Sequence, residues 1–412
     1  MPPNGFATSR RTFLRRLAYA SAGAWLAGCQ AAATATETPT ATRTPAPIPA
    51  TPTPQPSVAP TVTATATPTA SPAPSPTPPA QAADRIDTVL MFIQENHTFD
   101  SLFAGFPGAE SRYAGADCPD RLPSDPPHQH ADALAAADGA TATSARCSYT
   151  EASAPLYWEL ARRFTLCDRF FADVRGPSHP NYFMATSAQT PIVNSPSPTD
   201  LCPQFCYDYP TLATRLDEAG RTWRDYGGIL TDIRAMYQRP EVFDRQDAPY
   251  FADAAAGRLP NFAWLNSVFL DEGYAKSGHP TGSLCAAQNY AAQVLNAAMA
   301  GPQWPRMAIF LWWDDWGGFY DHVPPPEIET WADGTPYRYG FRVPCLVISP
   351  YARSGYVAHT RCSQLSILKF VEALYSLEPL TERDAAAENM LDCFDFNQAP
   401  LAPLTLAEMP CA

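Results

Sequence analysis

The sequence predicts an α/β domain built on a mostly parallel central sheet with helices on both faces. Apolar runs rich in β-forming residues have the length of buried strands, and they occupy residues 86–96, 307–315 and 342–352. Segments with helical spacing of apolar residues alternate with these runs, at residues 155–164, 281–300 and 363–377. This alternation is typical of a parallel sheet, in which ligands bind beyond the carboxyl ends of the strands.

The first 29 residues have the features of a targeting segment. Arg10 and Arg11 form a twin-arginine pattern, and residues 17–28 are apolar but too few to span a bilayer. The segment ends in "LAGC", which resembles a bacterial lipobox with Cys29 as the acylated residue. We therefore expect an exported, lipid-anchored protein at the cell surface or in the periplasm. The alternative is a chance cysteine after a signal of small residues.

Residues 30–83 are almost entirely Thr, Pro, Ala and Ser. Such a segment cannot bury apolar surface, and its prolines favour extended backbone. It predicts a disordered linker between the anchor and a folded domain at residues 84–412, which is long enough for one full core.

Charge and cysteine content narrow the class of protein. The formal net charge is −13 and no basic stripe is present, which argues against nucleic acid as a partner. Ten of the eleven cysteines remain once Cys29 is set aside. An even number in an exported protein predicts up to five disulfides, whose pairing the sequence does not reveal.

Two adjacent carboxylates, Asp314 and Asp315, end the second apolar strand. Like charges at a buried strand end are costly without a counter-charge, which a divalent cation would supply. Gly317 and Gly318 allow the backbone to turn close beside a ligand. The alternative is a solvated turn, but the aromatic residues that flank the pair argue against free solvation. We therefore predict that both aspartates bind a metal ion.

Glu95 and Asn96 follow the first apolar strand in the same way. Carboxylate and carboxamide oxygens are hard donors that suit a divalent cation. The alternative is an ordinary strand-end turn with a helix N-cap at Thr98 or Asp100.

Ser178 lies in a Gly/Pro turn that opens a helix. The N-terminus of a helix offers unpaired N–H groups and a positive dipole end, which favour a phosphate or an oxyanion. The alternative is an ordinary N-cap serine.

Two of the seven histidines, His130 and His279, lie in Pro/Gly contexts where functional sites often occur. Asp321 and His322 follow the doubled aspartate closely. We expect this second pair to support the turn rather than to act in catalysis.

Together these elements resemble the bacterial phosphoesterase family that contains phospholipase C and the respiratory-burst-inhibiting type of acid phosphatase. That family lies within the alkaline-phosphatase-like superfamily. The matching motifs occur in family order over nearly all of residues 86–376, and they are "VLMFIQENHTFDSLFAGFPGA", "HQHADAL", "LYWELARRFTLCDRFFADVRGPSHPNYF", "GHPTGS", "DDWGGFYDHVPPP", "GFRVPCLVISPYARSG" and "SILKFVEALY". The resemblance implies an alkaline-phosphatase-like fold and phosphoester hydrolysis.

The resemblance also implies roles for individual residues. The metal ligands would be Glu95, Asn96, Ser178, Asp314 and Asp315. Ser178 would in addition be the nucleophile. The metal would be divalent, and an oxygen-rich set suits Ca²⁺, Mg²⁺ or Mn²⁺, although Zn²⁺ occurs in related superfamilies.

Two histidines receive a role from the same resemblance. His130 and His279 would contact the phosphate or assist the leaving group.

Two departures from the family pattern leave the substrate open between a phosphomonoester and a phospholipid. The chain reads Pro180-Asn181-Tyr182 where phospholipase C members usually read Pro-Asn-Arg. It reads Ser363-Gln364-Leu365-Ser366 where many relatives read Asp-His-Thr-Ser. The predicted function is a metal-dependent phosphoester hydrolase with a serine nucleophile. The alternative is a catalytically silent, lipid-tethered binding module at the cell surface.

Overall fold

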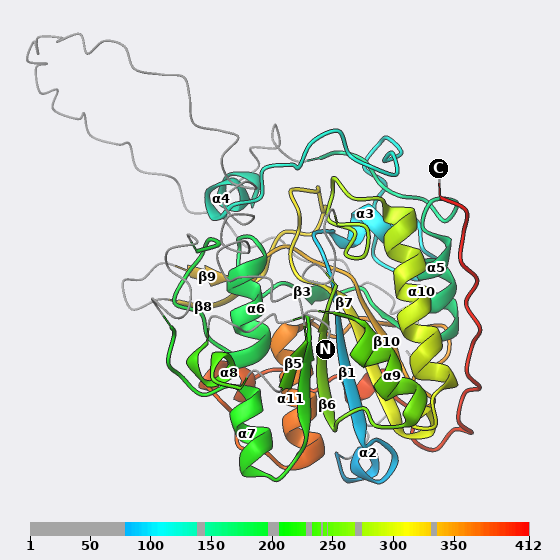
Figure 1. Cartoon of the computed structure of the whole chain (residues 1–412). Helices are drawn as coiled ribbons and strands as arrows, with labels where there is room; N and C mark the ends of the chain where they lie inside the picture. Colours follow the sequence, from blue (N-terminus) through cyan, green and yellow to red (C-terminus); the bar gives the residue numbers. More distant parts are fainter. Residues whose placement is uncertain are drawn as a thin grey trace, which may run out of the picture. The chain divides into compact units, whose positions relative to one another are not determined.

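The computed structural model has an eight-stranded central sheet with the order β11-β2-β10-β7-β1-β6-β4-β5 (Figure 1). Its strands are β1 (Thr88–Gln94), β2 (Thr165–Cys167), β4 (Trp223–Tyr226), β5 (Phe243–Asp244), β6 (Phe262–Asn266), β7 (Met307–Trp313), β10 (Cys345–Ile348) and β11 (Tyr356–Ala358). Two small sheets pair β3 (Phe170–Phe171) with β12 (Cys362–Ser363), and β8 (Glu327–Thr330) with β9 (Pro336–Arg338). The structure describes residues 79–137, 145–196, 206–227, 233–239, 242–244, 246–267, 274–330 and 336–411.

The two most apolar predicted strands lie side by side in the centre of the sheet. β1 and β7 are buried over their whole length and pair in parallel, from Thr88 opposite Met307 to Gln94 opposite Trp313. This register brings the ends of both strands to the same edge of the sheet. β10 runs antiparallel to its neighbours β7 and β2, while the other described pairs of this sheet are parallel. The predicted mostly parallel sheet is therefore confirmed.

Helices cover the sheet in two groups, which lie on either side of it in Figure 1. The members of each group contact one another. One group contains α5 (Pro155–Arg163), α9 (Ala248–Ala256) and α10 (Leu284–Ala300). The other contains α2 (Pro79–Arg85), α6 (Ser178–Ser187), α7 (Leu212–Glu218), α11 (Gln364–Tyr375) and α12 (Glu382–Ala385). The three predicted helices correspond to α5, α10 and α11.

Shorter helices lie in the connections. They are α3 (Phe99–Phe103), α4 (His130–Ala137), α8 (Arg234–Tyr237), η5 (Trp304–Arg306) and η6 (Leu391–Cys393). Figure 1 shows α3 and α4 beyond the carboxyl end of β1, the side on which the fold class predicts a ligand site.

The first described helix begins earlier than the predicted folded domain. Helix α2 starts at Pro79, whereas the linker was expected to continue to residue 83. Ala82 and Ile86 are buried in the main core, and α2 contacts α11. The described structure therefore begins before the predicted domain boundary at residue 84, with Ala82 of α2 packed into the core. The predicted signal, and the linker up to residue 78, lie outside the described residues.

The cysteines form fewer disulfides than the maximum the sequence allowed. Cys118 is bonded to Cys147 and Cys285 to Cys411, and Cys206 is also disulfide-bonded. Four others are buried thiols, namely Cys167, Cys345, Cys362 and Cys393. The Sγ atoms of Cys167 and Cys393 lie 3.7 Å apart, which is a contact and not a bond. The number of disulfides is therefore below the predicted maximum of five, because these four side chains fill the core as small hydrophobic groups.

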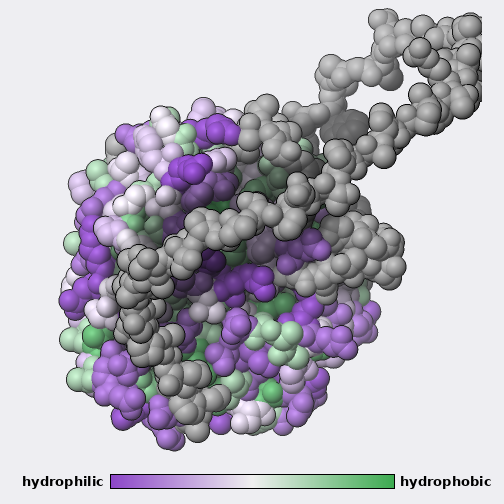
Figure 2. All heavy atoms as spheres, turned by 180° about the vertical axis from the view of Figure 1, so that it is seen from behind, coloured by the Kyte–Doolittle hydropathy of each residue, from purple (hydrophilic) through white to green (hydrophobic). Residues whose placement is uncertain are grey.

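The visible surface is mostly hydrophilic. On the face shown in Figure 2, hydrophobic residues form small patches that hydrophilic residues separate. Within the described ranges, the exposed large hydrophobic side chains are those of Tyr113, Leu134 and Val193. None of the described helices combines the length and the apolar character that crossing a bilayer requires.

Candidate active site

The ends of β1 and β7 bring together residues more than 200 positions apart. The backbone N–H of Asp314 donates to Gln94 O (3.2 Å), and the N–H of Asn96 donates to Asp314 Oδ1 (2.8 Å). Asn96 has a left-handed backbone with φ 62°, which turns the chain sharply after the strand. Gly317 also has positive φ, and a Cβ there would collide with the backbone of Asn96. The predicted close turn at Gly317 is therefore confirmed, and it packs against Asn96.

Ser178 is the first residue of α6, and Pro177 is its N-cap. The loop before it is held by Asn181, whose Oδ1 accepts a hydrogen bond from Val174 N (2.9 Å). Ser178 Oγ lies 3.2 Å from Asp315 Oδ2 and 3.4 Å from Glu95 Oε2. Its distance to Asn96 Oδ1 is also 3.4 Å. A serine hydroxyl thus meets three oxygen-bearing side chains at the N-terminus of a helix.

Three carboxyl groups at this point are buried together. Glu95 is 2% exposed, and Asp314 and Asp315 are fully buried. Burial raises the pKa of Glu95 well above its usual value, and the charges of Asp314 and Asp315 raise it further. Burial also raises the pKa of Asp315, with a further contribution from Asp314, and it raises the pKa of Asp314. In their charged forms these carboxyl groups therefore repel one another in a buried setting.

A divalent cation would fit this donor set. Asp314 Oδ2 is buried and has no hydrogen-bond partner within the described structure. No Lys or Arg in the described ranges forms an ion pair with Glu95, Asp314 or Asp315. Buried carboxylates without a counter-charge are costly, and hard oxygen donors suit a hard cation. The structure brings together all five predicted ligands, with Ser178 and Asn96 beside the three carboxyl groups.

The carboxamide of Asn96 can lie in two orientations with the same heavy-atom positions. In one, Oδ1 faces Ser178 and Nδ2 lies 3.3 Å from His128 Nε2. In the other, the NH₂ group donates to Glu95 Oε2 (3.0 Å) and Asp314 Oδ1 (3.2 Å), and the oxygen faces His128 and His279. A bound cation would favour the first, because only that orientation turns the carbonyl oxygen toward the carboxyl groups.

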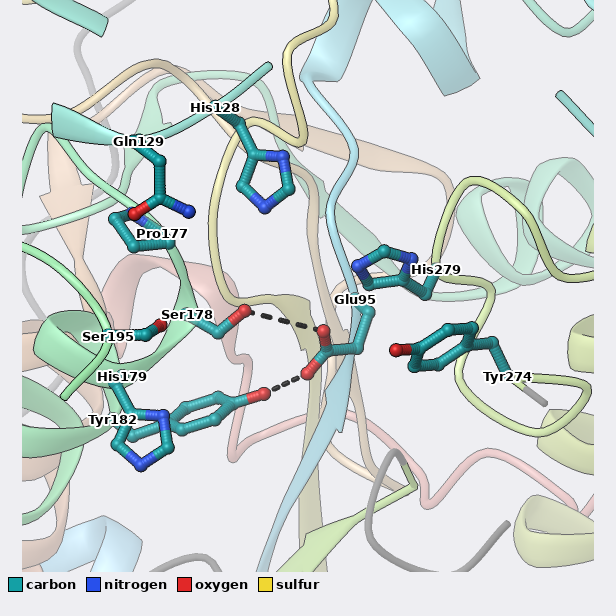
Figure 3. A pocket seen from close by; sticks show the side chains of 10 residues that line it. All are labelled: Glu95, His128, Gln129, Pro177, Ser178, His179, Tyr182, Ser195, Tyr274 and His279. Carbon is teal, nitrogen blue, oxygen red and sulfur yellow. Dashed lines mark hydrogen bonds between the residues drawn. The ribbon is translucent and has the colours of Figure 1, made fainter. Parts of the chain in front are cut away.

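A cavity opens directly above Ser178 and Glu95 (Figure 3). In Figure 3, Ser178 and Tyr182 point at Glu95 from one side, and Tyr274 from the other, with the rings of His128 and His279 above. Burial, followed by the neighbouring rings of His128 and His97, lowers the pKa of His279 to about 3. Burial acts in the same direction on His128, but the negative charges of Asp315 and Asp125 outweigh it, so its pKa is raised.

The structure places His130 differently from the prediction. His130 is absent from the residues that line this cavity, whereas its neighbour His128 lines it. The Nδ1 atom of His130 donates to the backbone carbonyl of Arg175, and its backbone N–H donates to Asn194 Oδ1 (2.8 Å). His130 is the first residue of α4, and its ring is turned toward the loop that leads to Ser178. The structure therefore places the ring of His128, rather than that of His130, in the cavity beside Ser178.

Two tyrosines at the site were not predicted. Tyr182 donates a hydrogen bond to Glu95 Oε1, from the second turn of α6. Tyr274 stacks on His279 with ring centroids 4.2 Å apart. The departure from Pro-Asn-Arg marked Tyr182 as unusual, but the sequence has no signal for its contact with Glu95. Helical spacing supplies the reason, since residues 178 and 182 lie on one face of α6.

Asp321 and His322 belong to a separate buried cluster. The fully buried guanidinium of Arg342 lies 3.0 Å from Asp100 and 3.1 Å from Asp321. His322 Nδ1 lies 2.7 Å from Asp100 Oδ2. Asp100, Asp321 and His322 are close enough to hold an ion, but Arg342 already supplies the counter-charge. This arrangement supports the expected structural role of Asp321 and His322.

Known proteins resemble this chain over most of its folded part. Non-specific phospholipase C1 of Arabidopsis thaliana is 32% identical over 276 residues, which cover 60% of this chain and 51% of the relative. Phospholipase C B of Mycobacterium tuberculosis is 27% identical over 303 residues, covering 61% and 57%. The chain spans about half the length of the curated relatives it matches.

A solved structure from the alkaline phosphatase superfamily, from Vibrio parahaemolyticus, covers 74% of this chain and 70% of its own, with 11% identity and a TM-score of 0.41. The sequence profile of the Phosphoesterase family matches residues 86–378, from the start of β1 to beyond the end of α11. This match includes all five predicted metal ligands, both cavity histidines and the central strands, and the chain belongs to the Phosphoesterase family.

Proposed function

We propose that this protein hydrolyses phosphoesters with Ser178 as nucleophile and a divalent cation as cofactor. The observation that carries the proposal is the position of Ser178 Oγ. This atom lies at a helix N-terminus and within 3.4 Å of side-chain oxygens from Glu95, Asn96 and Asp315. A phosphoryl group needs a nucleophile, positive potential and a proton source, and phosphoryl transfer depends mainly on their positions.

The cation would be held by Glu95, Asn96, Asp314 and Asp315, with Ser178 as a further ligand. When bound, it supplies a Lewis acid that lowers the pKa of the serine hydroxyl and neutralises phosphate charge. Tyr182 orients Glu95 through its hydrogen bond to Oε1, which leaves Oε2 on the side of Ser178. Glu95, Asp314 and Asp315 are buried, whereas Ser178 is partly exposed and lines the cavity.

The chain's own residues carry the chemical steps. Ser178 Oγ attacks phosphorus, so that an O–P bond to serine forms while the bond to the leaving oxygen breaks. The leaving oxygen takes its proton from a cavity imidazole, either His279 or His128 when its Nε2 is protonated. Water then attacks the phosphoseryl group, releases the phosphate product and restores the serine.

The substrate class within this reaction follows from the relatives. Several matching proteins are named phospholipase C, which favours a phospholipid or another phosphodiester. Tyr182 stands where phospholipase C members usually have arginine. This departure leaves a phosphomonoester as the alternative substrate. Both substrates place the same phosphoryl group against Ser178.

Hydrolysis of p-nitrophenyl phosphate and p-nitrophenyl phosphorylcholine tests the proposal, with and without EDTA. We expect turnover by the wild type, loss of turnover with EDTA and recovery on addition of Ca²⁺, Mg²⁺, Mn²⁺ or Zn²⁺. The Ser178→Ala variant should lose turnover but keep its thermal midpoint, and acid quenching of the wild type should trap phosphate on Ser178. Full activity of Ser178→Ala would reject the serine assignment. A wild type inactive on both substrates with every metal would instead favour a silent binding module.

We also propose that the protein is exported and lipid-anchored through Cys29, with residues 30–78 as the spacer. The support is the twin-arginine and lipobox pattern, together with disulfides such as Cys118–Cys147, which are typical of oxidising compartments. Metabolic labelling with a radioactive fatty acid should mark the wild type but not Cys29→Ala. Labelling of both proteins would contradict the anchor.

A further inference from the structure

Asp125 lies next to both cavity histidines, just outside the residues that line the cavity itself. Its side chain is 44% exposed, and Oδ1 lies 3.5 Å from His128 Nδ1. Its other oxygen, Oδ2, lies 3.9 Å from His279 Nε2. The carboxylate therefore stands between solvent and the two rings that face an incoming phosphoryl group.

Few charged side chains of the described residues line the cavity. Glu95 is the acidic residue among its described lining residues, which include no Lys or Arg. A bound divalent cation would offset two of the three negative charges of Glu95, Asp314 and Asp315. Asp125 adds a further negative charge beside the two cavity histidines, and its carboxylate also faces solvent.

Asp125, His128 and His279 are near enough to one another to hold an ion, but the hydrogen bonds of His128 argue against that role. Its Nδ1 lies 2.7 Å from the carbonyl oxygen of Pro126, which can only accept, so this nitrogen carries the proton. In the Asn96 orientation that suits a cation, His128 Nε2 accepts from Asn96 Nδ2 (3.3 Å). Both ring nitrogens are therefore engaged, and Asp125 is left to act by its charge.

We propose that Asp125 is a specificity-determining residue that selects substrates by the charge on the group attached to the phosphate. Its carboxylate favours a phosphodiester whose headgroup carries a positive charge, and it disfavours a phosphomonoester dianion. The ring of Tyr274, stacked on His279, offers an aromatic face in the same region for such a cation. This inference rests on the proposed function and names the substrate class of the same site.

Three substrates with one leaving group test the inference. p-Nitrophenyl phosphorylcholine, bis-p-nitrophenyl phosphate and p-nitrophenyl phosphate differ in charge but all release p-nitrophenol. We expect Asp125→Asn to lower the ratio of kcat/KM for the phosphorylcholine to that for the monoester on the order of tenfold, because one charge is removed close to the substrate. Asp125→Lys should lower the ratio further, and the diester should fall between the other two. The wild-type preference should weaken as salt rises.

Glu159→Gln is the matched control, since it removes one exposed acidic charge from α5, outside the cavity lining. It should leave the ratio unchanged. An equal loss of kcat/KM for all three substrates in Asp125→Asn would overturn the inference and make Asp125 a positioning residue for the histidines. An unchanged ratio would also overturn it.

Calorimetric binding of phosphorylcholine and inorganic phosphate makes the same comparison without turnover. We expect Asp125→Asn to weaken phosphorylcholine binding relative to phosphate binding. If the wild type binds both ligands with this selectivity but hydrolyses none of the three esters, the proposed function fails and the assignment of Asp125 stands. If hydrolysis proceeds but neither rate ratios nor binding ratios respond to Asp125, only the assignment fails.

Discussion

The side-chain amide of Gln364 donates a 2.8 Å hydrogen bond to the backbone carbonyl of Asp314. Its Oε1 accepts a hydrogen bond from Asp173 N (3.1 Å), and Gln364 itself is fully buried. One side chain thus links the end of β7 to the segment that leads to Ser178. Gln364 stands where many relatives have the histidine of Asp-His-Thr-Ser. In this protein the glutamine at that position joins the two segments through its hydrogen bonds.

Replacing Gln364 by Leu should separate these two halves of the site. The carbonyl of Asp314 and the N–H of Asp173 would both lose a buried partner, at about 1–3 kcal/mol each. We expect a lower thermal midpoint and a fall in kcat of at least tenfold. Gln364→Glu keeps the acceptor for Asp173 but not the donor for Asp314. Its thermal midpoint and kcat should therefore lie between those of Gln364→Leu and the wild type. Wild-type kcat in the Leu variant would show that the link does not position Ser178.

The two cavity histidines can be told apart by the leaving group. p-Nitrophenol leaves without a proton, whereas an alkyl alcohol needs one. One of the two variants, His128→Asn or His279→Asn, lacks the proton donor. Its rate of hydrolysis should fall about 10²–10⁴-fold with an alkyl ester and much less with a p-nitrophenyl ester. His130→Asn is the control and should show no such difference between leaving groups. Equal losses with both esters in both variants would exclude either ring as the donor.

Tyr182→Phe should weaken metal binding without disturbing the fold. The variant keeps the ring, which packs against His179, but removes the hydrogen bond to Glu95 Oε1. Losing a residue that orients a metal ligand typically costs 10–100-fold in metal affinity or activity. Titration of the metal-free protein with each divalent cation measures the effect. Tyr250→Phe removes another buried hydroxyl, bonded to Val294 O, and should leave metal affinity unchanged.

Asp314→Asn should change stability in opposite directions with and without metal. Burial and mutual repulsion hold the pKa values of Glu95 and Asp315 well above their usual range, so removing one charge should stabilise the metal-free protein at pH 7. The wild type should gain about 2.7 kcal/mol from a cation at 100 times its dissociation constant, and the variant should gain far less. Thermal melts in EDTA and in each metal salt measure both effects. A destabilised variant in EDTA would contradict the repulsion.

Glu372→Gln should remove a pH-dependent destabilisation far from the site. Glu372 on α11 is 2% exposed, and burial, followed by the nearby Asp384, raises its pKa to about 8. Because the folded state holds this proton up to a higher pH than the unfolded state, the contribution of Glu372 to stability falls as pH rises from about 4.5 to 8. The midpoint of the variant should exceed that of the wild type more at pH 8.5 than at pH 5, by roughly 2–4 °C for each kcal/mol. A constant difference across this range would contradict the raised pKa.

Local sequence patterns were sufficient for the elements that bury apolar side chains. Residues 86–96 and 307–315 became β1 and β7, and both carry their acidic residues at the strand ends as expected. Ser178 opens a helix, as its Gly/Pro turn predicted. These features depend on neighbours in the chain, such as strand length, helix spacing and turn residues, so the sequence contains the information directly.

Local sequence patterns could not predict which distant segments contact one another. His128 and His130 lie two residues apart in one motif, and only the path of the chain before α4 decides which ring faces Ser178. Tyr274 also reaches the cavity from a separate loop, and Asp125 contacts the two cavity histidines from another. The four buried thiols show the same limit, because cysteine number does not reveal which Sγ atoms meet.

By itself, the sequence determined three central strands, the helices α5, α10 and α11, and the acidic residues at the strand ends, because burial and turn chemistry act between near neighbours. The tertiary structure decided which side chains share one cavity. The parallel register of β1 and β7 places Asn96 beside Asp314, and Gln364 holds that edge to the loop of Ser178. A site assembled from segments more than 200 residues apart depends on sheet register and loop paths, which the packing of the whole domain sets.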